Sequence, residues 1–262
     1  MSWKIATWNV NSLKARHEHV LTWLAESKVD ILALQELKAL AVDQEFINAV
    51  SKLGYHLEYV GQKAYNGVAI ISKIKSSKRP IKFLVHAPEN QARFLALDFN
   101  NLTVVCVYVP NGSEVGSEKY HYKLAWLDAL EAWLSAKIKP ETQLLLLGDF
   151  NIAPNINDTY EPKLWEGKVL ASEPERLRYQ NIISTGLDDT YIKIVNPEDR
   201  FTWWDYRAGA FQKNNGCRID LILATRECMA KLIELNIDNS PRAWDKPSDH
   251  CPVIATFEGE VA

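Results

Sequence analysis

The chain has 262 residues, of which 47% are hydrophobic and 24% are charged. This composition provides enough apolar material for a large buried core and excludes a disordered chain. Glycine and proline occur 11 times each, so collagen-like and low-complexity sequences are excluded as well. The formal net charge of −3 argues against a protein that coats nucleic acid through bulk electrostatics, but it allows a local basic face.

Targeting segments and cysteine motifs are not apparent. The longest aliphatic run, Leu144 to Leu147, is too short to cross a bilayer, and the N-terminus lacks a basic head followed by an apolar stretch. The four cysteines form no CxxC pair, so neither a zinc site nor a disulfide framework is expected. We therefore expect a cytoplasmic protein that does not associate with membranes.

Short β-branched and aliphatic runs predict strands along the whole chain. They lie at 4–10, 30–34, 67–72, 94–99, 102–109, 143–147, 218–224 and 251–257. Helical patterns lie between them at 13–26, 43–53, 117–138 and from 172 to about 186. Asp43 is a candidate N-cap, and Ser172 and Glu175 have the spacing of a capping box.

The connections between these elements favour mixed sheets. Only Asn100 and Asn101 separate two consecutive predicted strands, which is typical of a hairpin and disfavours a purely parallel sheet. Two mixed sheets packed face to face, with helices outside, would bury such apolar strands on both faces. Without a linker or a repeat, we predict one α/β domain at 1–258 and a short C-terminal tail at 259–262.

Polar residues recur where the predicted strands begin or end. A buried carboxylate is costly unless it is paired or bound to a metal, so this placement suggests convergence on one site. The alternative is ordinary turn chemistry, which also favours Asn and Asp. The residues concerned are Asn9, Asn11, Gln35, Glu36, Asn111, Asp149, Asn151, Asp220, Asp249 and His250.

Asp149 and Asn151 are two residues apart, so an extended segment would direct both side chains to the same side. That pair is suited to holding a nucleophile. His250 could be a structural residue, or it could be oriented by Asp220 or Asp249 to stabilise phosphate charge; spacing does not choose between these partners. An oxygen-rich set with one His favours Mg²⁺ over Zn²⁺.

The sequence resembles the exonuclease III family of abasic-site endonucleases, within the endonuclease/exonuclease/phosphatase superfamily. GDFN and SDH alone would indicate only the superfamily, whereas the remaining segments favour the DNA-repair branch. The matching segments cover nearly the whole chain in order: TWNVNSLKAR (7–16), ALQELK (33–38), YNGVAIISK (65–73), VYVPNG (107–112), YKLAWL (122–127), LLLGDFNIAP (145–154), FTWWDYR (201–207), RIDLILAT (218–225) and KPSDHCPV (246–253).

The resemblance implies a four-layer sandwich of two mixed β-sheets flanked by helices, and it implies roles for individual residues. Glu36 would be the principal ligand of Mg²⁺, which Mn²⁺ could replace. Asp149 would orient or deprotonate the attacking water, and Asn151 would hold that water or a phosphate oxygen. The other residues implied in the metal region are Asn9, Asn11, Asp149, Asn151, Asp220, Asp249 and His250, and those implied at the phosphate are Tyr108, Asn111 and His250, the last supported by Asp220.

Substrate selection is implied to rest on other residues. Trp203, Cys217 and Ile219 would build a pocket for a flipped-out abasic sugar, although Trp and Ile are commonly core residues. Cys217 departs from the family pattern, where a larger apolar residue is frequent, which leaves the balance of endonuclease and exonuclease action open. The candidates for DNA contact are Lys38, Tyr65, Asn66, Lys73, Arg178 and Arg207, although such basic residues are often simply solvated.

We therefore expect a monomeric, Mg²⁺-dependent abasic-site endonuclease of base excision repair. It would act on double-stranded DNA with abasic sites or blocked 3′ ends, cleave the phosphodiester 5′ to the lesion and leave a 3′-hydroxyl, with 3′-phosphodiesterase, 3′-phosphatase and 3′→5′ exonuclease action as companions. The alternatives are a predominantly exonucleolytic or small-phosphoester-cleaving member of the same family and a non-catalytic module that binds damaged DNA.

Overall fold

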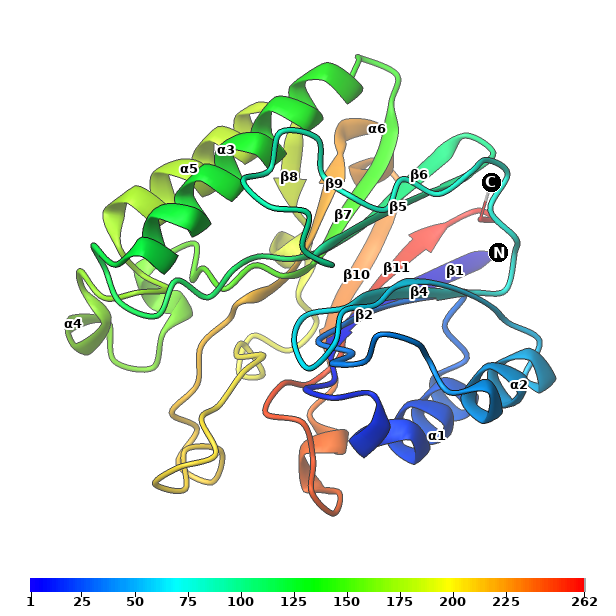
Figure 1. Cartoon of the computed structure of the whole chain (residues 1–262), viewed down its shortest axis with the longest axis horizontal. Helices are drawn as coiled ribbons and strands as arrows, with labels where there is room; N and C mark the ends of the chain where they lie inside the picture. The colour runs from blue at the N-terminus through cyan, green and yellow to red at the C-terminus, as the bar shows by residue number, and fades with distance from the viewer. Residues whose placement is uncertain (262) are drawn as a thin grey trace.

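The computed structural model describes residues 1–261, which form two mixed β-sheets packed face to face with helices on the outside (Figure 1). The first sheet has the strand order β10-β11-β1-β2-β4-β3. Its strands in chain order are β1 (Ser2–Asn9), β2 (Ile31–Gln35), β3 (His56–Val60), β4 (Val68–Ser72), β10 (Leu232–Ile237) and β11 (Val253–Glu258).

The second sheet has the order β5-β6-β7-β9-β8. Its strands are β5 (Phe94–Phe99), β6 (Leu102–Tyr108), β7 (Gln143–Asp149), β8 (Leu187–Asp189) and β9 (Asp220–Thr225). β6 and β7 are parallel, whereas β5 pairs with β6, and β9 with β7, in antiparallel fashion. The predicted hairpin at Asn100 and Asn101 is therefore confirmed.

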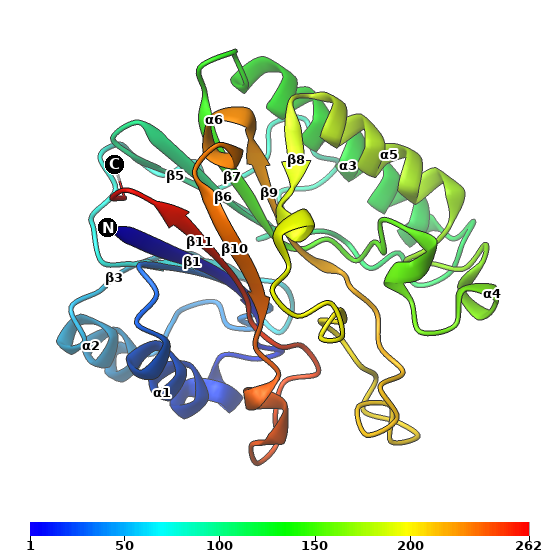
Figure 2. The same ribbon diagram turned by 180° about the vertical axis from the view of Figure 1, so that it is seen from behind.

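Helices cover the outer face of each sheet (Figures 1 and 2). α1 (His17–Ser27) and α2 (Gln44–Lys52) pack on the first sheet, and α3 (Glu118–Lys137) and α5 (Glu173–Ser184) pack on the second. The short helices are α4 (Pro162–Trp165), α6 (Arg226–Met229), η1 (Lys14–Arg16), η2 (Ile156–Asp158), η3 (Thr190–Lys193) and η4 (Ser240–Ala243). The predicted caps are confirmed, because Asp43 accepts from Glu45 N–H and Ser172 and Glu175 form a capping box.

Both faces of the central strands are buried, which explains their continuous apolar sequences. In β1, Trp3 and Ile5 face the core between the sheets, while Ala6 and Trp8 face the helical layer with Trp23 of α1. This alternation follows from the two-residue period of a strand. The four-layer α/β sandwich predicted from the sequence is thus confirmed.

The chain ends lie together at the end of the sheets opposite Asn9, the last residue of β1. Gly259 N–H donates to the carbonyl of Met1 at 3.0 Å, and Val261 packs partly against the core. Of the predicted tail at 259–262, residue 262 lies outside the described residues. Within residues 1–261, no helix combines the length and apolar character that a membrane span requires.

Gly148 of β7 sits where no side chain fits. Its φ is 150°, and a Cβ atom there would lie 1.9 Å from the carbonyl oxygen of Val107 on the neighbouring strand. We expect Gly148→Ala to lower the free energy of unfolding by about 3 kcal/mol, measured by urea denaturation. Gly54→Ala is the control: Gly54 has a φ of 85° with nothing within 4 Å of a Cβ, so only the backbone cost of about 1 kcal/mol applies. Equal losses in the two variants would contradict the steric explanation.

Candidate active site

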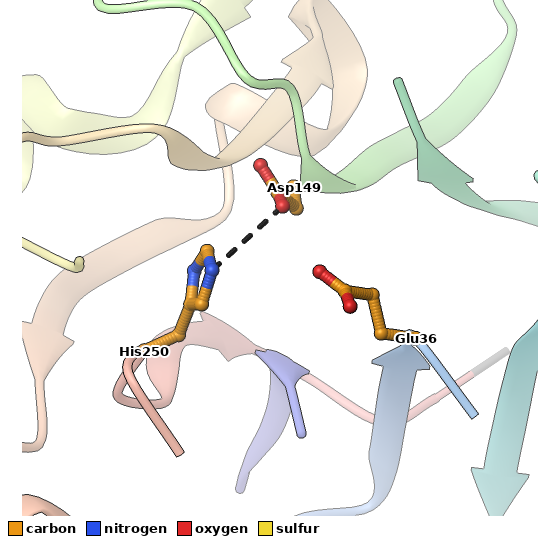
Figure 3. Close-up of side chains that lie close together, drawn as sticks. All are labelled: Glu36, Asp149 and His250. Atoms are coloured by element: carbon orange, nitrogen blue, oxygen red, sulfur yellow. Dashed lines mark ion pairs between the residues drawn. The ribbon is translucent and has the colours of Figure 1, made fainter. Parts of the chain in front are cut away.

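Several strand ends meet at one edge of the sandwich. β1 ends at Asn9, Glu36 follows β2, and β7 ends at Asp149. β9 runs antiparallel to β7, so its first residue, Asp220, pairs directly with Asp149. His250 precedes β11 and enters the same space, and the side chains of Glu36, Asp149 and His250 point toward one another (Figure 3). Segments far apart in the chain therefore supply one site, as the pattern of polar strand ends predicts.

Glu36, Asp149 and His250 form a group that could hold a metal ion. One ligand atom from each lies within 4.8 Å of the others. The Asn9 amide donates to Glu36 Oε1 at 2.8 Å and to Asp149 Oδ2 at 2.9 Å, so it holds the two carboxylates close together. The donor set is dominated by oxygen, and Asp220 Oδ1 is buried without a hydrogen-bond partner among the described residues. These features fit a hard divalent cation.

Lys38 connects the Glu36 carboxylate to Asn11. The Lys38 ammonium lies 2.8 Å from Glu36 Oε2 and also donates to Asn11 Oδ1. The Asn11 amide donates in turn to Asp249 Oδ1 at 2.9 Å, and Trp203 Nε1 donates to Asp249 Oδ2 at 3.0 Å. Asp249 thus lies at the edge of the group, where it fixes Asn11 and Trp203.

The backbone of the site is held in an uncommon conformation. Asn11, Glu36, Lys38, Asn66 and Asn151 all have positive φ angles, between 44° and 56°. Asn tolerates this left-handed region, but Glu and Lys are disfavoured there. Strain of this kind is retained where the surrounding structure imposes it, and it is concentrated at functional sites.

His250 is buried between three carboxylates. Its Nδ1 lies 2.8 Å from Asp220 Oδ2, and its Nε2 faces Asp149 Oδ2 at 3.9 Å. Burial alone would lower the pKa of His250, but Asp220 and then Asp249 and Asp149 raise it to about 10. The ring is therefore an imidazolium at neutral pH, which donates one N–H to Asp220 and directs the other into the cleft. An imidazolium suits contact with phosphate better than metal ligation.

Asp149 is buried at the centre of the site. Burial raises its pKa to about 7, against the opposing effect of the His250 charge. Asn151 N–H donates to Asp149 Oδ1 at 2.8 Å, and the Asn151 amide donates to Asp149 Oδ2 at 3.2 Å. The Asn111 amide donates to Asn151 Oδ1 at 3.0 Å. Asp149, Asn151 and Asn111 therefore form a connected row, and the carboxylate has a pKa close to that of a useful general base.

Tyr108 presents a phenol to the same cleft. Burial, followed by the charges of Glu36 and Asp149, raises its pKa well above the ordinary value. The guanidinium of Arg93 lies 4.7 Å from the centre of its ring. Tyr108 is therefore a protonated phenol that can donate a hydrogen bond.

A cavity of about 300 Å³ adjoins these groups. The predicted pocket residues Trp203 and Ile219 line it, whereas Cys217 is fully buried and packs against Ile219 away from the opening. Trp165, Val169 and Leu170 complete the wall. Trp165 is the last residue of the short helix α4, and Val169 and Leu170 lie in the irregular segment that follows it, so no periodic pattern marked them in the sequence.

The residues predicted to contact DNA are dispersed. Lys38 lies inside the site, Tyr65 is 70% exposed, and Asn66 is buried with hydrogen bonds to Gln62 and Gln91. Arg207 is exposed on the loop after Tyr206. Lys73 and Arg178 do not join the site: Lys73 pairs with Asp30 at the opposite end of β2, and Arg178 pairs with Asp128 between α3 and α5.

Known proteins are similar to this chain in sequence and in fold. The model of the Endonuclease/Exonuclease/phosphatase family matches residues 6–250. Exodeoxyribonuclease III of Haemophilus influenzae is 32% identical to this chain, over 97% of this chain and 100% of its own length. A 3′ phosphatase from Neisseria, solved with a product DNA hairpin, is 39% identical with a TM-score of 0.91, over 98% of this chain and 100% of that one. An AP endonuclease from Archaeoglobus fulgidus is 35% identical with a TM-score of 0.92 and the same coverage. This chain therefore belongs to the endonuclease/exonuclease/phosphatase family and, within it, to the exonuclease III group of nucleases.

Proposed function

We propose that this protein is a Mg²⁺-dependent DNA phosphoesterase that cleaves the phosphodiester 5′ to an abasic site and leaves a 3′-hydroxyl. The observation that carries this proposal is the meeting of Glu36, Asp149 and His250 at a cavity that has an apolar wall. The Archaeoglobus fulgidus relative is an AP endonuclease, and a relative from Dictyostelium discoideum, 26% identical, is a DNA-(apurinic or apyrimidinic site) endonuclease.

Glu36 would hold the cation, with Asn9, Asn11 and Asp249 supporting its surroundings. When bound, Mg²⁺, or Mn²⁺ in its place, would neutralise charge on the phosphate oxygens. The Asn9 amide donates to both the Glu36 and the Asp149 carboxylate, so both carboxylates would face the same phosphate.

The remaining groups would act on water and phosphate. Asp149 would accept a proton from the attacking water, and Asn151 would orient that water or a phosphate oxygen. The amide of Asn111 and the imidazolium of His250 would donate to phosphate oxygens, and Asp220 would keep His250 charged and oriented. Tyr108 would donate beside the leaving group. Preorganised donors of this kind commonly contribute ~10²–10³-fold each.

The cavity would select the substrate. Trp203, Ile219 and Leu170 give it an apolar wall that suits a sugar without its base. Lys38, Tyr65, Asn66 and Arg207 would contact the duplex on either side of the lesion. Arg178 is engaged with Asp128 between α3 and α5, so it would contact DNA only through its remaining N–H donors.

Processing of 3′ ends is the second candidate. The polar side of the cavity, which includes Asn111, Asp149 and His250, would accept a terminal phosphate as well as an internal one. The Neisseria relatives, at 39% and 40% identity, are described as a 3′ phosphatase and a 3′-5′ exonuclease. An active site of this kind would remove a 3′-phosphate or a 3′-terminal nucleotide by the same chemistry.

The test is gel analysis of three labelled duplexes, with one central abasic analogue, a plain recessed 3′ end or a 3′-phosphate. We expect one product of defined length from the abasic duplex with Mg²⁺, lost on chelation and restored by Mg²⁺ or Mn²⁺. A ladder from the 3′ end without internal incision would favour the second candidate. Failure to cleave any of them with both ions would contradict the proposal and favour a module that only binds damaged DNA.

The cellular location and the oligomeric state of the protein are further predictions. The four cysteines are free and buried, which supports a reducing, cytoplasmic location.

A monomer is expected because Glu36, Asp149 and His250 all come from one chain, and gel filtration with light scattering checks this.

A further inference from the structure

We propose that a buried ion pair between Lys123 of α3 and Glu175 of α5 positions the catalytic amides and the cavity wall. Neither side chain is accessible to solvent, and both lie behind the cleft rather than in it. They act through the backbone of three loops, and they touch neither the phosphate nor the cation site. This inference rests on the proposed function of Asn111 and Asn151.

Lys123 holds two of the loops that carry catalytic residues. Its ammonium donates to the carbonyl of Asn151 at 2.6 Å and to the carbonyl of Asn111 at 3.2 Å, and its third donor goes to Glu175 Oε1. An ammonium has three donors, so this geometry uses all of them. The two loops are thereby fixed relative to each other, and this sets the hydrogen bond of 3.0 Å between the side chains of Asn111 and Asn151.

Glu175 holds the third loop, which supplies the cavity wall. Its Oε1 accepts from Leu170 N–H at 3.0 Å, and its Oε2 accepts from Ser172 N–H at 3.1 Å and from the Ser172 hydroxyl. The Leu170 carbonyl in turn accepts from Ala153 N–H at 2.7 Å, two residues beyond Asn151. The ion pair therefore joins the phosphate-binding row to the wall that lines the cavity.

The chemistry of the pair suits positioning rather than stability. A buried ion pair has a large desolvation cost, and apolar residues of similar volume often stabilise a fold equally well. Apolar side chains could fill the space between α3 and α5, but they could not hold the carbonyls of Asn111 and Asn151 at hydrogen-bond distance. Small errors in the position of reacting groups reduce turnover strongly while substrate binding persists.

The experiment uses the double variant K123M/E175Q, which removes both charges and keeps one acceptor oxygen, for either Leu170 N–H or Ser172 N–H. Steady-state kinetics on the abasic duplex, thermal unfolding and the NMR signals of the Asn side-chain amides are measured. We expect kcat to fall at least ~10-fold with KM within ~3-fold of the wild type, together with shifted amide signals of Asn111 and Asn151 in a folded protein. K78M/D98N is the control, because that ion pair lies at β5 away from the cleft.

A coupling test separates positioning from general destabilisation. In the background of Asn151→Ala, K123M/E175Q should reduce kcat by a smaller factor than it does in the wild type, because one of the side chains that it positions is already gone. A second neutral pair, K123Q/E175Q, keeps an amide donor toward the carbonyls of Asn111 and Asn151, so it should show a smaller loss of kcat, and it keeps the proposal testable if K123M/E175Q does not fold. Wild-type kcat in a folded double variant, unmoved amide signals, or fully multiplicative losses would overturn the proposal. Failure of the wild type to cleave the abasic duplex would instead overturn the proposed function, and the NMR comparison would still test the positioning.

Discussion

Replacing Asp149 with Asn is expected to reduce kcat on the abasic duplex by about 10²–10⁴-fold. Asn has the same shape but cannot accept a proton from water, and it offers a weaker acceptor to the Asn9 amide, which lies 2.9 Å away. The protein should remain folded, because Asp149 is a buried carboxylate whose raised pKa shows that burial disfavours its charged form. Single-turnover cleavage gives the rate, and thermal unfolding gives the stability.

The unfolding temperature of Asp149→Asn distinguishes a loss of catalysis from a loss of folding. Because the charge of Asp149 is costly to bury, neutralising it by Asp149→Asn should leave the unfolding temperature unchanged or raise it. Asp98→Asn is the control: Asp98 lies on β5, pairs with Lys78 and hydrogen-bonds to Thr103 away from the cleft, so turnover should be retained. A folded Asp149→Asn enzyme with most of its wild-type turnover would rule out the role assigned to Asp149.

Replacing His250 with Asn should reduce kcat by about 10²–10³-fold, because a preorganised cationic donor to the phosphate is lost. The pH profile of kcat/KM gives the more selective test. In the wild type, activity should fall as the pH decreases through about 7, where Asp149 becomes protonated, and as the pH increases through about 10, where His250 loses its proton. The variant should lose the alkaline limb, and its acidic limb should move to higher pH because the His250 charge that lowers the pKa of Asp149 is gone.

A second variant identifies the source of the His250 charge. Asp220→Asn removes the carboxylate that lies 2.8 Å from Nδ1 and contributes most to raising the pKa of His250. Its alkaline limb should therefore move to lower pH. An alkaline limb that stays in place in both variants would show that His250 does not act as a cation during cleavage.

The strands that the sequence predicted are those with mostly buried residues, and they include one edge strand, β5. β1, β2, β4, β6 and β7 carry continuous apolar runs, because each lies inside a sheet between the central core and a helical layer. β3, β8 and β10 were missed, and all three are edge strands. Their sequences mix charged and apolar residues, as in Glu58 of β3 and Glu234 of β10, because one side of each strand faces solvent.

The candidate site was predictable where it depended on local spacing. Asp149 and Asn151 were expected on the same side, and the structure joins them by hydrogen bonds. The partner of His250 could not be chosen from spacing, because it depends on the antiparallel register that sets Asp220 opposite Asp149. Asp249, the neighbour in sequence, binds Asn11 and Trp203 instead.

Residues that act across elements gave no sequence signal. Lys123 lies within a helical pattern and Glu175 within a capping box, and each is accounted for locally without reference to the other. Their contact depends on how α3 and α5 pack side by side on the second sheet (Figure 2). Which polar residues of α3 and α5 contact the loops of the cleft therefore depends on tertiary packing.

The central claim is that distant segments of this chain gather around one hard cation beside one phosphate. A crystal structure of the protein with Mn²⁺ and an abasic duplex, with anomalous diffraction from the metal, tests it most directly. We predict an anomalous peak at about 2.0–2.4 Å from a Glu36 carboxylate oxygen, with the scissile phosphate between that ion and the side chains of Asp149 and His250. A metal bound away from Glu36, or a phosphate out of reach of both Asp149 and His250, would contradict the account.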